Sequence, residues 1–168
     1  SYFRYADGTP YHQFGTTCYV WNHQPEALQR QTLKTLSAAP FNKIRFCVFP
    51  KAYAYNRNEP ERFAFVKNPD GKFDFTRPDP AFWRHIESRI FDLQRLGIEA
   101  DLILWHPYDR WGFAQMPRET DLFYLRYVIA RISAYRNVWW SLANEWDFVH
   151  HKKIEDWDTI GQTIAQYD

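Results

Sequence analysis

The sequence predicts an α/β fold that forms the first four strand–helix units of a (β/α)8 barrel, preceded by a hairpin. Apolar, strand-like runs alternate four times with stretches of helical periodicity, which is typical of parallel strands joined by crossover helices. No glycine-rich loop follows the first strand, so the usual dinucleotide-binding signature of an open sheet is missing. Polar and ionisable residues instead follow the ends of several strands, where barrel enzymes place their chemistry.

The first third of the chain predicts a hairpin, two strands and a helix. Aromatic and polar side chains alternate over residues 2–15 around Asp7-Gly8, a strong hairpin signal because glycine tolerates the positive φ of tight turns. Pro25 suits the first turn of a helix, and Pro50 ends an apolar strand. We expect the first strand over residues 14–20, the helix over 24–40 and the second strand over 43–49.

A long loop over residues 50–78 is expected next, since this segment is rich in Pro, Asn, Tyr and charge and lacks sustained periodicity. The second helix opens at Asp79-Pro80, a capping residue followed by proline, and Gly97 ends it. The remaining elements are expected as strand three over residues 98–105, helix three over 119–135, strand four over 137–143 and helix four from 154 onward.

The chain has 168 residues, whereas a complete barrel typically needs about 250. We therefore expect one domain over residues 1–168 that supplies half of a barrel. Either the chain is a fragment, or two copies associate to close the sheet. Unpaired edges on strands one and four favour self-association, so a homo-oligomer is expected.

Composition excludes several classes of partner. The formal net charge of +1 gives no basis for capturing nucleic acid or an anionic membrane, and no apolar run reaches the roughly 20 residues that cross a bilayer. Only two cysteines occur and no leader is visible, which favours the cytoplasm, although a leader could have been removed before Ser1. Aromatic residues make up 20% of the chain, and their flat faces suit stacking against sugar rings.

The sharpest motif is Asn144-Glu145, which directly follows the fourth predicted strand. A strand that finishes in adjacent amide and carboxyl side chains directs them toward the mouth of a barrel. Glycoside hydrolysis needs a carboxylic acid to protonate the departing oxygen and a second carboxylate across the scissile bond. A neighbouring amide can bond the sugar 2-hydroxyl as positive charge develops at the anomeric carbon. The motif therefore predicts glycosidase chemistry, with a solvated loop pair as the alternative.

The segment Trp140-Ser141-Leu142-Ala143-Asn144-Glu145 resembles the strand-four signature of the clan A glycoside hydrolases. The opening Phe3-Arg4-Tyr5-Ala6-Asp7-Gly8-Thr9-Pro10, with Gly15-Thr16-Thr17 and Trp21, resembles the apiosidase-like branch of those barrels, and the resemblance covers nearly the whole chain. It implies a retaining, two-carboxylate hydrolysis of O-glycosidic bonds. It also implies that Glu145 is the acid/base and that Asn144 contacts the 2-hydroxyl.

The same resemblance gives roles to Arg45 on strand two, which would orient the nucleophile, and to His106 at the end of strand three, which matches an active-site histidine. An arginine among apolar residues also predicts an ion pair by itself, because an unpaired buried charge is costly. The family's nucleophilic Glu follows strand seven, which this chain does not contain. Neither Asp109 nor Asp147 matches it, so the isolated chain is expected to be inactive.

Further substrate contacts are expected from residues in the loops that follow the strands, namely Trp21, Tyr108, Trp111, Trp146 and Asp147. Packing in the core is an equal alternative for most of these rings. No cofactor or metal is expected, since the histidines lack converging spacing and no zinc motif occurs. Two other functions stay open: a carbohydrate-binding or structural module without catalysis, and an α/β protein of another class such as an oxidoreductase, which a sheet order that reverses in the middle would favour.

Overall fold

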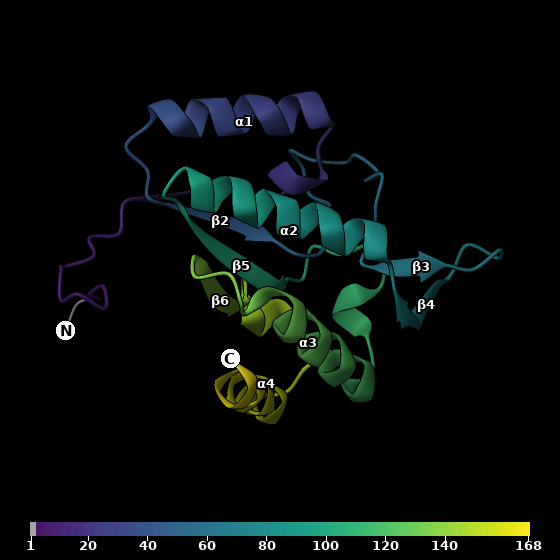
Figure 1. The fold of residues 1–168 in the computed structure, drawn as a ribbon. Helices are drawn as coiled ribbons and strands as arrows, with labels where there is room; N and C mark the ends of the chain where they lie inside the picture. Colours follow the sequence, from purple (N-terminus) through teal and green to yellow (C-terminus); the bar gives the residue numbers. More distant parts are fainter. Residues whose placement is uncertain (1–2) are drawn as a thin grey trace.

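The structure, a computed structural model, describes residues 3–168. It contains a four-stranded sheet and a separate two-stranded sheet, with four α-helices (Figure 1). In chain order the elements are β1 (Gly15–Thr17), α1 (Glu26–Ala38), β2 (Lys43–Cys47), β3 (Phe65–Lys67), β4 (Phe73–Pro78), α2 (Pro80–Arg95), β5 (Glu99–Trp105), α3 (Arg118–Ile132), β6 (Val138–Ala143) and α4 (Ile154–Tyr167). Short 3-10 turns occupy Trp21–His23 (η1), Phe113–Gln115 (η2) and Trp146–Phe148 (η3).

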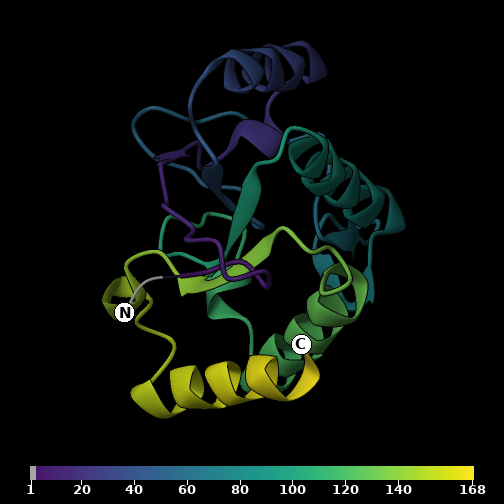
Figure 2. The same cartoon turned by 60° about the vertical axis from the view of Figure 1, so that its left-hand side comes forward.

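The larger sheet is parallel throughout, and its strand order, β1-β2-β5-β6, follows the order of the chain. This order has no reversal, which counts against the open-sheet alternative. Figure 2 shows the four helices in an arc along one side of the strands. The expected α/β alternation of four parallel strands with four helices is therefore confirmed, with strand and helix ends within a few residues of the expected positions.

Helix α2 begins and ends where its sequence signals place it. The Asp79 Oδ1 atom accepts a hydrogen bond from the backbone N–H of Ala81 at 2.8 Å, and Pro80 occupies the first helical position, where its missing N–H costs nothing. Gly97, at φ 72°, takes the left-handed conformation that ends the helix. The buried face of the helix repeats at helical spacing through Phe82, Ile86, Ile90 and Leu93.

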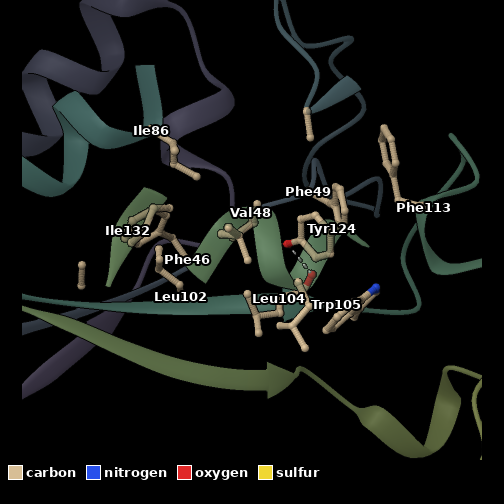
Figure 3. Close-up of a cluster of buried hydrophobic side chains, with 14 of the residues drawn as sticks. Phe46, Val48, Phe49, Ile86, Leu102, Leu104, Trp105, Phe113, Tyr124 and Ile132 are labelled. Atoms are coloured by element: carbon tan, nitrogen blue, oxygen red, sulfur yellow. Dashed lines mark hydrogen bonds between the residues drawn. The ribbon is translucent and has the colours of Figure 1, made fainter. Parts of the chain in front are cut away.

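The core lies between the helices and the sheet face that alternate strand residues present to them. On β2 and β5 this face is fully buried and consists of Ile44, Phe46, Ala100, Leu102 and Leu104. Figure 3 shows this cluster, with Tyr124 from α3 donating its hydroxyl to the Leu104 carbonyl at 3.3 Å. Each large apolar side chain buried here contributes about 1.5–3 kcal/mol to folding.

The other sheet face carries charge. Lys43 on β2 pairs with Asp101 on β5 at 3.3 Å, and the Ser141 hydroxyl on β6 donates to the same carboxylate at 2.6 Å. The Trp139 indole N–H donates to Glu99 at 3.1 Å. Polar side chains thus bridge neighbouring strands on the face that no helix covers.

Residues 65–78 do not form the loop expected from their composition. They form the antiparallel pair β3–β4, joined by a turn in which Gly71 has φ 82° and donates its N–H to the Asn68 carbonyl at 2.9 Å. The rings of Phe73 and Phe75 pack against Phe113 in η2, with centroids 4.8 and 6.4 Å away. The expectation overlooked that Asp70-Gly71, followed by alternating aromatic residues, is the same hairpin signal that residues 2–15 carry.

The N-terminal hairpin is shorter than the expected span of residues 2–15. Tyr2 lies outside the described residues; Arg4 and Pro10 form an antiparallel bridge, and the Tyr11 N–H donates to the Phe3 carbonyl at 2.9 Å. The rings of Phe3 and Tyr11 lie 4.7 and 5.8 Å from that of Trp139, near the start of β6. The hairpin therefore covers the N-terminal end of the strands and leaves the opposite end open. Within residues 3–168, the helices are all too short or too polar to span a lipid bilayer.

Candidate functional site

Polar side chains gather where the parallel strands end. Asn144 and Glu145 follow β6, His106 follows β5, Lys51 lies shortly after β2, and Tyr19 lies shortly after β1. Because the carboxyl ends of parallel strands meet at one edge of the sheet, the topology brings these five residues together.

Glu145 is exposed and is held from one side. The Tyr108 hydroxyl donates to its Oε2 atom at 2.5 Å, and the hydrogen bond to this carboxylate raises the pKa of Tyr108 above its ordinary value. Among residues 3–168, Glu145 is the only non-glycine with positive φ, at φ 51° and ψ 56°. The left-handed backbone turns the chain sharply from β6 into η3, and such strain in a non-glycine residue is found most often at functional sites.

Asn144 is buried and is oriented by two contacts. Its Oδ1 atom accepts a hydrogen bond from the Tyr19 hydroxyl at 3.0 Å, and its backbone N–H donates to the Trp105 carbonyl at 3.0 Å. The Nδ2 atom is buried and has no partner within residues 3–168. Since the oxygen is already occupied by Tyr19, the amide keeps its N–H donors available for a ligand.

Lys51 is a member of this group that the sequence reasoning missed. Its side chain is 3% exposed, and its ammonium lies 3.6 Å from the ring centroid of Tyr19 and 4.2 Å from that of Tyr108. Burial lowers the pKa of Lys51, and the nearby carboxylate of Glu145 acts in the opposite direction. Its position just after the second strand is the same signal that singled out Asn144 and Glu145, and it was available in the sequence.

Arg45 and His106 lie in the same region, and their expected roles toward a substrate stay predictions. Arg45 has no ion pair with any described residue, and its Nε atom is buried without a partner, so the expected ion pair is not formed within residues 3–168. His106 is 2% exposed, its Nε2 lies 3.2 Å from the Phe49 carbonyl, and burial lowers its pKa to about 4. The neutral imidazole therefore donates through Nε2 and is suited to hold the loop after β2, with direct contact to a sugar remaining a prediction.

The aromatic residues expected to contact a sugar differ in how exposed they are. Trp21 is 4% exposed and packs edge-on against Phe46, so η1 places its ring in the core, which was the alternative to the expected sugar contact. Trp111 is half-buried and donates its indole N–H to Glu59 at 3.2 Å, beside the loop after β2. Tyr108 is at the site. Trp146 is 52% exposed in η3, and Asp147 beside it is also exposed.

Asp109, the other carboxylate near the mouth, is turned toward its own loop. Its Oδ1 atom accepts from the N–H groups of Trp111 and Gly112 at 2.8 and 3.2 Å, and its Oδ2 atom accepts from Ala114 at 2.6 Å. These bonds occupy both oxygens in organising the turn before η2. Within the described part of the chain, no three His, Cys, Asp or Glu side chains converge as metal ligands would.

The arrangement thus offers a solvent-accessible carboxyl group, a buried amide with a free donor, and a nearby cation. A carboxyl group that reaches solvent can exchange a proton with a ligand, and an oriented amide can donate to a hydroxyl beside it. Both groups project from the end of one strand, so a ligand over β6 can meet them together.

Comparison with known proteins gives a family and similar folds for the chain. Residues 1–168 match the apiosidase-like catalytic domain family. The chain superposes with a TM-score of 0.94 and 48% identity on a "putative glycoside hydrolase" from Bacteroides vulgatus ATCC 8482, over 99% of this chain and 35% of that one. A family 5 glycoside hydrolase from the same organism gives 0.73 and 16%, with the same coverage.

A more distant neighbour is the hyperthermostable endo-1,4-β-D-mannanase from Thermotoga petrophila RKU-1, with a TM-score of 0.62 and 16% identity over 94% of this chain and 53% of that one. The two neighbours at 16% identity support the fold alone. No curated protein matches the sequence. The chain spans about a third of the length of the first two relatives, at 35% of each. With the whole sequence matched, the chain belongs to the apiosidase-like catalytic domain family of the glycoside hydrolases.

Proposed function

We propose that these 168 residues are the first half of a (β/α)8 barrel whose parent protein hydrolyses O-glycosidic bonds, with Glu145 as the acid/base. The family and the fold of its neighbours support this assignment. The sheet order β1-β2-β5-β6, which follows the chain, and the helices on one side of it also fit a barrel.

The observation that carries the proposal is the geometry at the end of β6. Glu145 presents a carboxyl group to solvent and accepts a hydrogen bond from Tyr108. The adjacent Asn144 is buried and accepts a hydrogen bond from Tyr19, and its Nδ2 atom has no partner within residues 3–168. A loop pair placed there by accident would not have both side chains oriented by tyrosines from two other loops. The carboxylate of Asp109, in contrast, accepts a backbone hydrogen bond within its own turn, which favours Glu145 as the acid/base.

In the first chemical step, the Glu145 carboxyl group gives its proton to the departing glycosidic oxygen while a second carboxylate attacks the anomeric carbon. In the second step, Glu145 takes a proton from water, and the resulting oxygen nucleophile displaces the second carboxylate with net retention. Asn144 Nδ2 donates to the sugar 2-hydroxyl, and Arg45 orients the second carboxylate. We place that carboxylate outside these 168 residues, so the isolated chain should be inactive.

The test compares the parent protein with the isolated chain on a broad panel of 4-nitrophenyl glycosides. The parent should release nitrophenolate from at least one substrate, and Glu145→Gln should lower kcat by about 100-fold or more. Glu155→Gln, at an exposed position in α4, is the matched control and should retain activity. The anomer that forms first, read by proton NMR, reports retention.

Clear turnover by the isolated chain, or full activity in Glu145→Gln, would show that the assignment is wrong. Binding of oligosaccharides by the parent without any turnover would favour the alternative of a carbohydrate-binding module. Trp146, Phe148 and the other exposed rings near Glu145 serve binding as well as they serve catalysis, so only turnover separates the two functions.

Self-association of the isolated chain also belongs to this proposal. β1 and β6 each pair with one neighbour, and beside β6 lies an open groove of about 360 Å³ lined by Trp146, Ile154 and Trp157. In the parent, we expect the next strand–helix unit to cover this groove. Size-exclusion chromatography of the isolated chain should give a species larger than a monomer, and a clean monomer would contradict the expectation.

A further inference from the structure

Lys51 has an unusual environment for a charged side chain. It is 3% exposed, and its ammonium lies among three rings: those of Tyr19 at 3.6 Å, Tyr108 at 4.2 Å and Tyr53 at 5.1 Å. Burying an ammonium is costly, and cation–π contacts with several electron-rich faces offset part of that cost. No carboxylate of the described residues forms an ion pair with it within 4.0 Å. Such an arrangement indicates a role beyond solubility.

The rings that hold Lys51 also hold the two candidate functional side chains. Tyr19 donates its hydroxyl to the Asn144 Oδ1 atom at 3.0 Å, and Tyr108 donates to the Glu145 Oε2 atom at 2.5 Å. The ammonium therefore lies between two phenols that each hold one side chain of the pair. Lys51 thus contacts both phenols at once.

The backbone around Lys51 is fixed to the same loops. The Lys51 carbonyl accepts a hydrogen bond from the Asn56 side chain at 2.9 Å, and the Ala52 N–H donates to the Tyr108 carbonyl at 2.9 Å. The loop after β2 is thus joined to the loop after β5 next to the contact between Lys51 and Tyr108. This connection limits the positions that the ammonium can take.

We propose that Lys51 is a positioning residue for the Asn144–Glu145 pair, acting through Tyr19 and Tyr108. The cation holds the two phenol rings face-on, and their hydroxyls then fix the amide and the carboxyl group. This inference rests on the proposed function of Glu145. It adds to that function a residue outside the Asn144–Glu145 motif, in the loop after β2, whose effect on catalysis passes through two tyrosines.

The first experiment needs no turnover. Tyrosine-selective 13C NMR of the 168-residue chain is recorded for the wild type, Lys51→Met and Lys67→Met. Lys67, on β3, is the matched control, because its ammonium also lies over an aromatic ring, 4.1 Å from the centroid of Phe63, outside the site. In Lys51→Met the resonances of Tyr19 and Tyr108 should move, while that of Tyr124, buried in the core, should not. Unchanged Tyr19 and Tyr108 resonances would overturn the proposal whether or not the parent is an enzyme.

The second experiment uses the parent protein and separates positioning of the acid from general damage to the fold. Protonation by Glu145 is needed for a poor leaving group and hardly for an activated one. Because kcat/KM reports only the steps up to formation of the glycosyl-enzyme, Lys51→Met should lower kcat/KM on an alkyl glycoside by about 10- to 100-fold, and on the 2,4-dinitrophenyl glycoside of the same sugar by less than about threefold. The substrate sugar is the one that the nitrophenyl panel identifies.

Two further variants make the result decisive. Lys51→Arg keeps a cation over the rings and should recover most of the lost rate on the alkyl glycoside. In a Tyr108→Phe background, Lys51→Met should cost much less than it does alone, because the path to Glu145 is already broken. Equal losses on both leaving groups, or full additivity of the two substitutions, would contradict a positioning role even if Glu145 proves to be the acid/base.

Discussion

Lowering the pH from 7 to 5 should cost the chain roughly 2 kcal/mol of unfolding free energy through His106 alone. Burial lowers the pKa of His106 to about 4 from an ordinary value of 6.5, because the imidazolium would lose its hydration in a site that is 2% exposed. A tenfold change in proton affinity corresponds to about 1.4 kcal/mol, so the whole difference is worth about 3 kcal/mol, of which roughly 2 kcal/mol is lost by pH 5.

The direction follows from which state takes up the proton. As the pH falls below 6.5, the unfolded chain binds a proton at this histidine while the folded chain does not until about pH 4. The unfolded state is therefore favoured progressively, and stability falls as the pH falls through this window. His23, whose pKa burial also lowers to about 4, should add a similar loss.

Urea denaturation followed by tryptophan fluorescence at pH 7 and pH 5 measures this effect in the wild type, His106→Gln and His150→Gln. His106→Gln should lose about 2 kcal/mol less than the wild type over that interval, whatever its stability at pH 7, because other titrating groups cancel in the comparison. His150 is exposed, so its replacement should keep the wild-type dependence. Equal pH dependence in wild type and His106→Gln would refute the reasoning, as would an NMR titration that places the His106 midpoint near 6.5.

Two further perturbations test local features of the fold. Glu145→Gly should stabilise the isolated chain by about 1 kcal/mol in the same denaturation assay, because glycine adopts φ 51° without strain. The control Glu155→Gly, in α4, should instead destabilise the chain. A loss of stability in Glu145→Gly would contradict the argument that the backbone at Glu145 is strained. Asn137→Ala should lower the free energy of unfolding by about 2–4 kcal/mol. The buried Nδ2 atom of Asn137 donates to the carbonyls of Ile90 and Ile98, each at 3.1 Å, and both carbonyls would lose a partner. A loss below about 0.5 kcal/mol would show that these hydrogen bonds contribute little.

The sequence predicted those features of the fold that depend only on residues close together in the chain. Asp79-Pro80 and Gly97 bound α2 because capping and the left-handed stop depend only on neighbouring residues. The four parallel strands were predictable because their apolar runs lie between such signals. Asn144 and Glu145 were predictable as a pair at the sheet's carboxyl edge, since strand alternation fixes where that edge lies.

Features that depend on contacts between distant segments were not predictable in this way. Trp21 follows β1, as a residue at the barrel mouth would, but it lies in a turn of 3-10 helix and its ring packs edge-on against Phe46. The left-handed backbone of Glu145 leaves no sequence signal, because glutamate rarely adopts it. Lys51 could be placed near the mouth, yet its burial between Tyr19 and Tyr108 depends on loops that follow three different strands.

Arg45 offers a test of the proposal that the second carboxylate lies outside this chain. On the same sheet face, Lys43 is paired with Asp101, whereas Arg45 has no ion pair with a described residue and its Nε atom is buried without a partner. An uncompensated, half-buried charge destabilises the isolated chain, so Arg45→Met should leave its unfolding free energy unchanged or raise it. In the parent, where we propose that a second carboxylate meets the guanidinium, the same substitution should lower kcat by about 100-fold. Lys43→Met is the control that should destabilise the isolated chain, because it strands Asp101. A marked loss of stability in the isolated Arg45→Met chain would mean that Arg45 is already compensated within these residues, and the argument for a carboxylate from elsewhere would lose its basis.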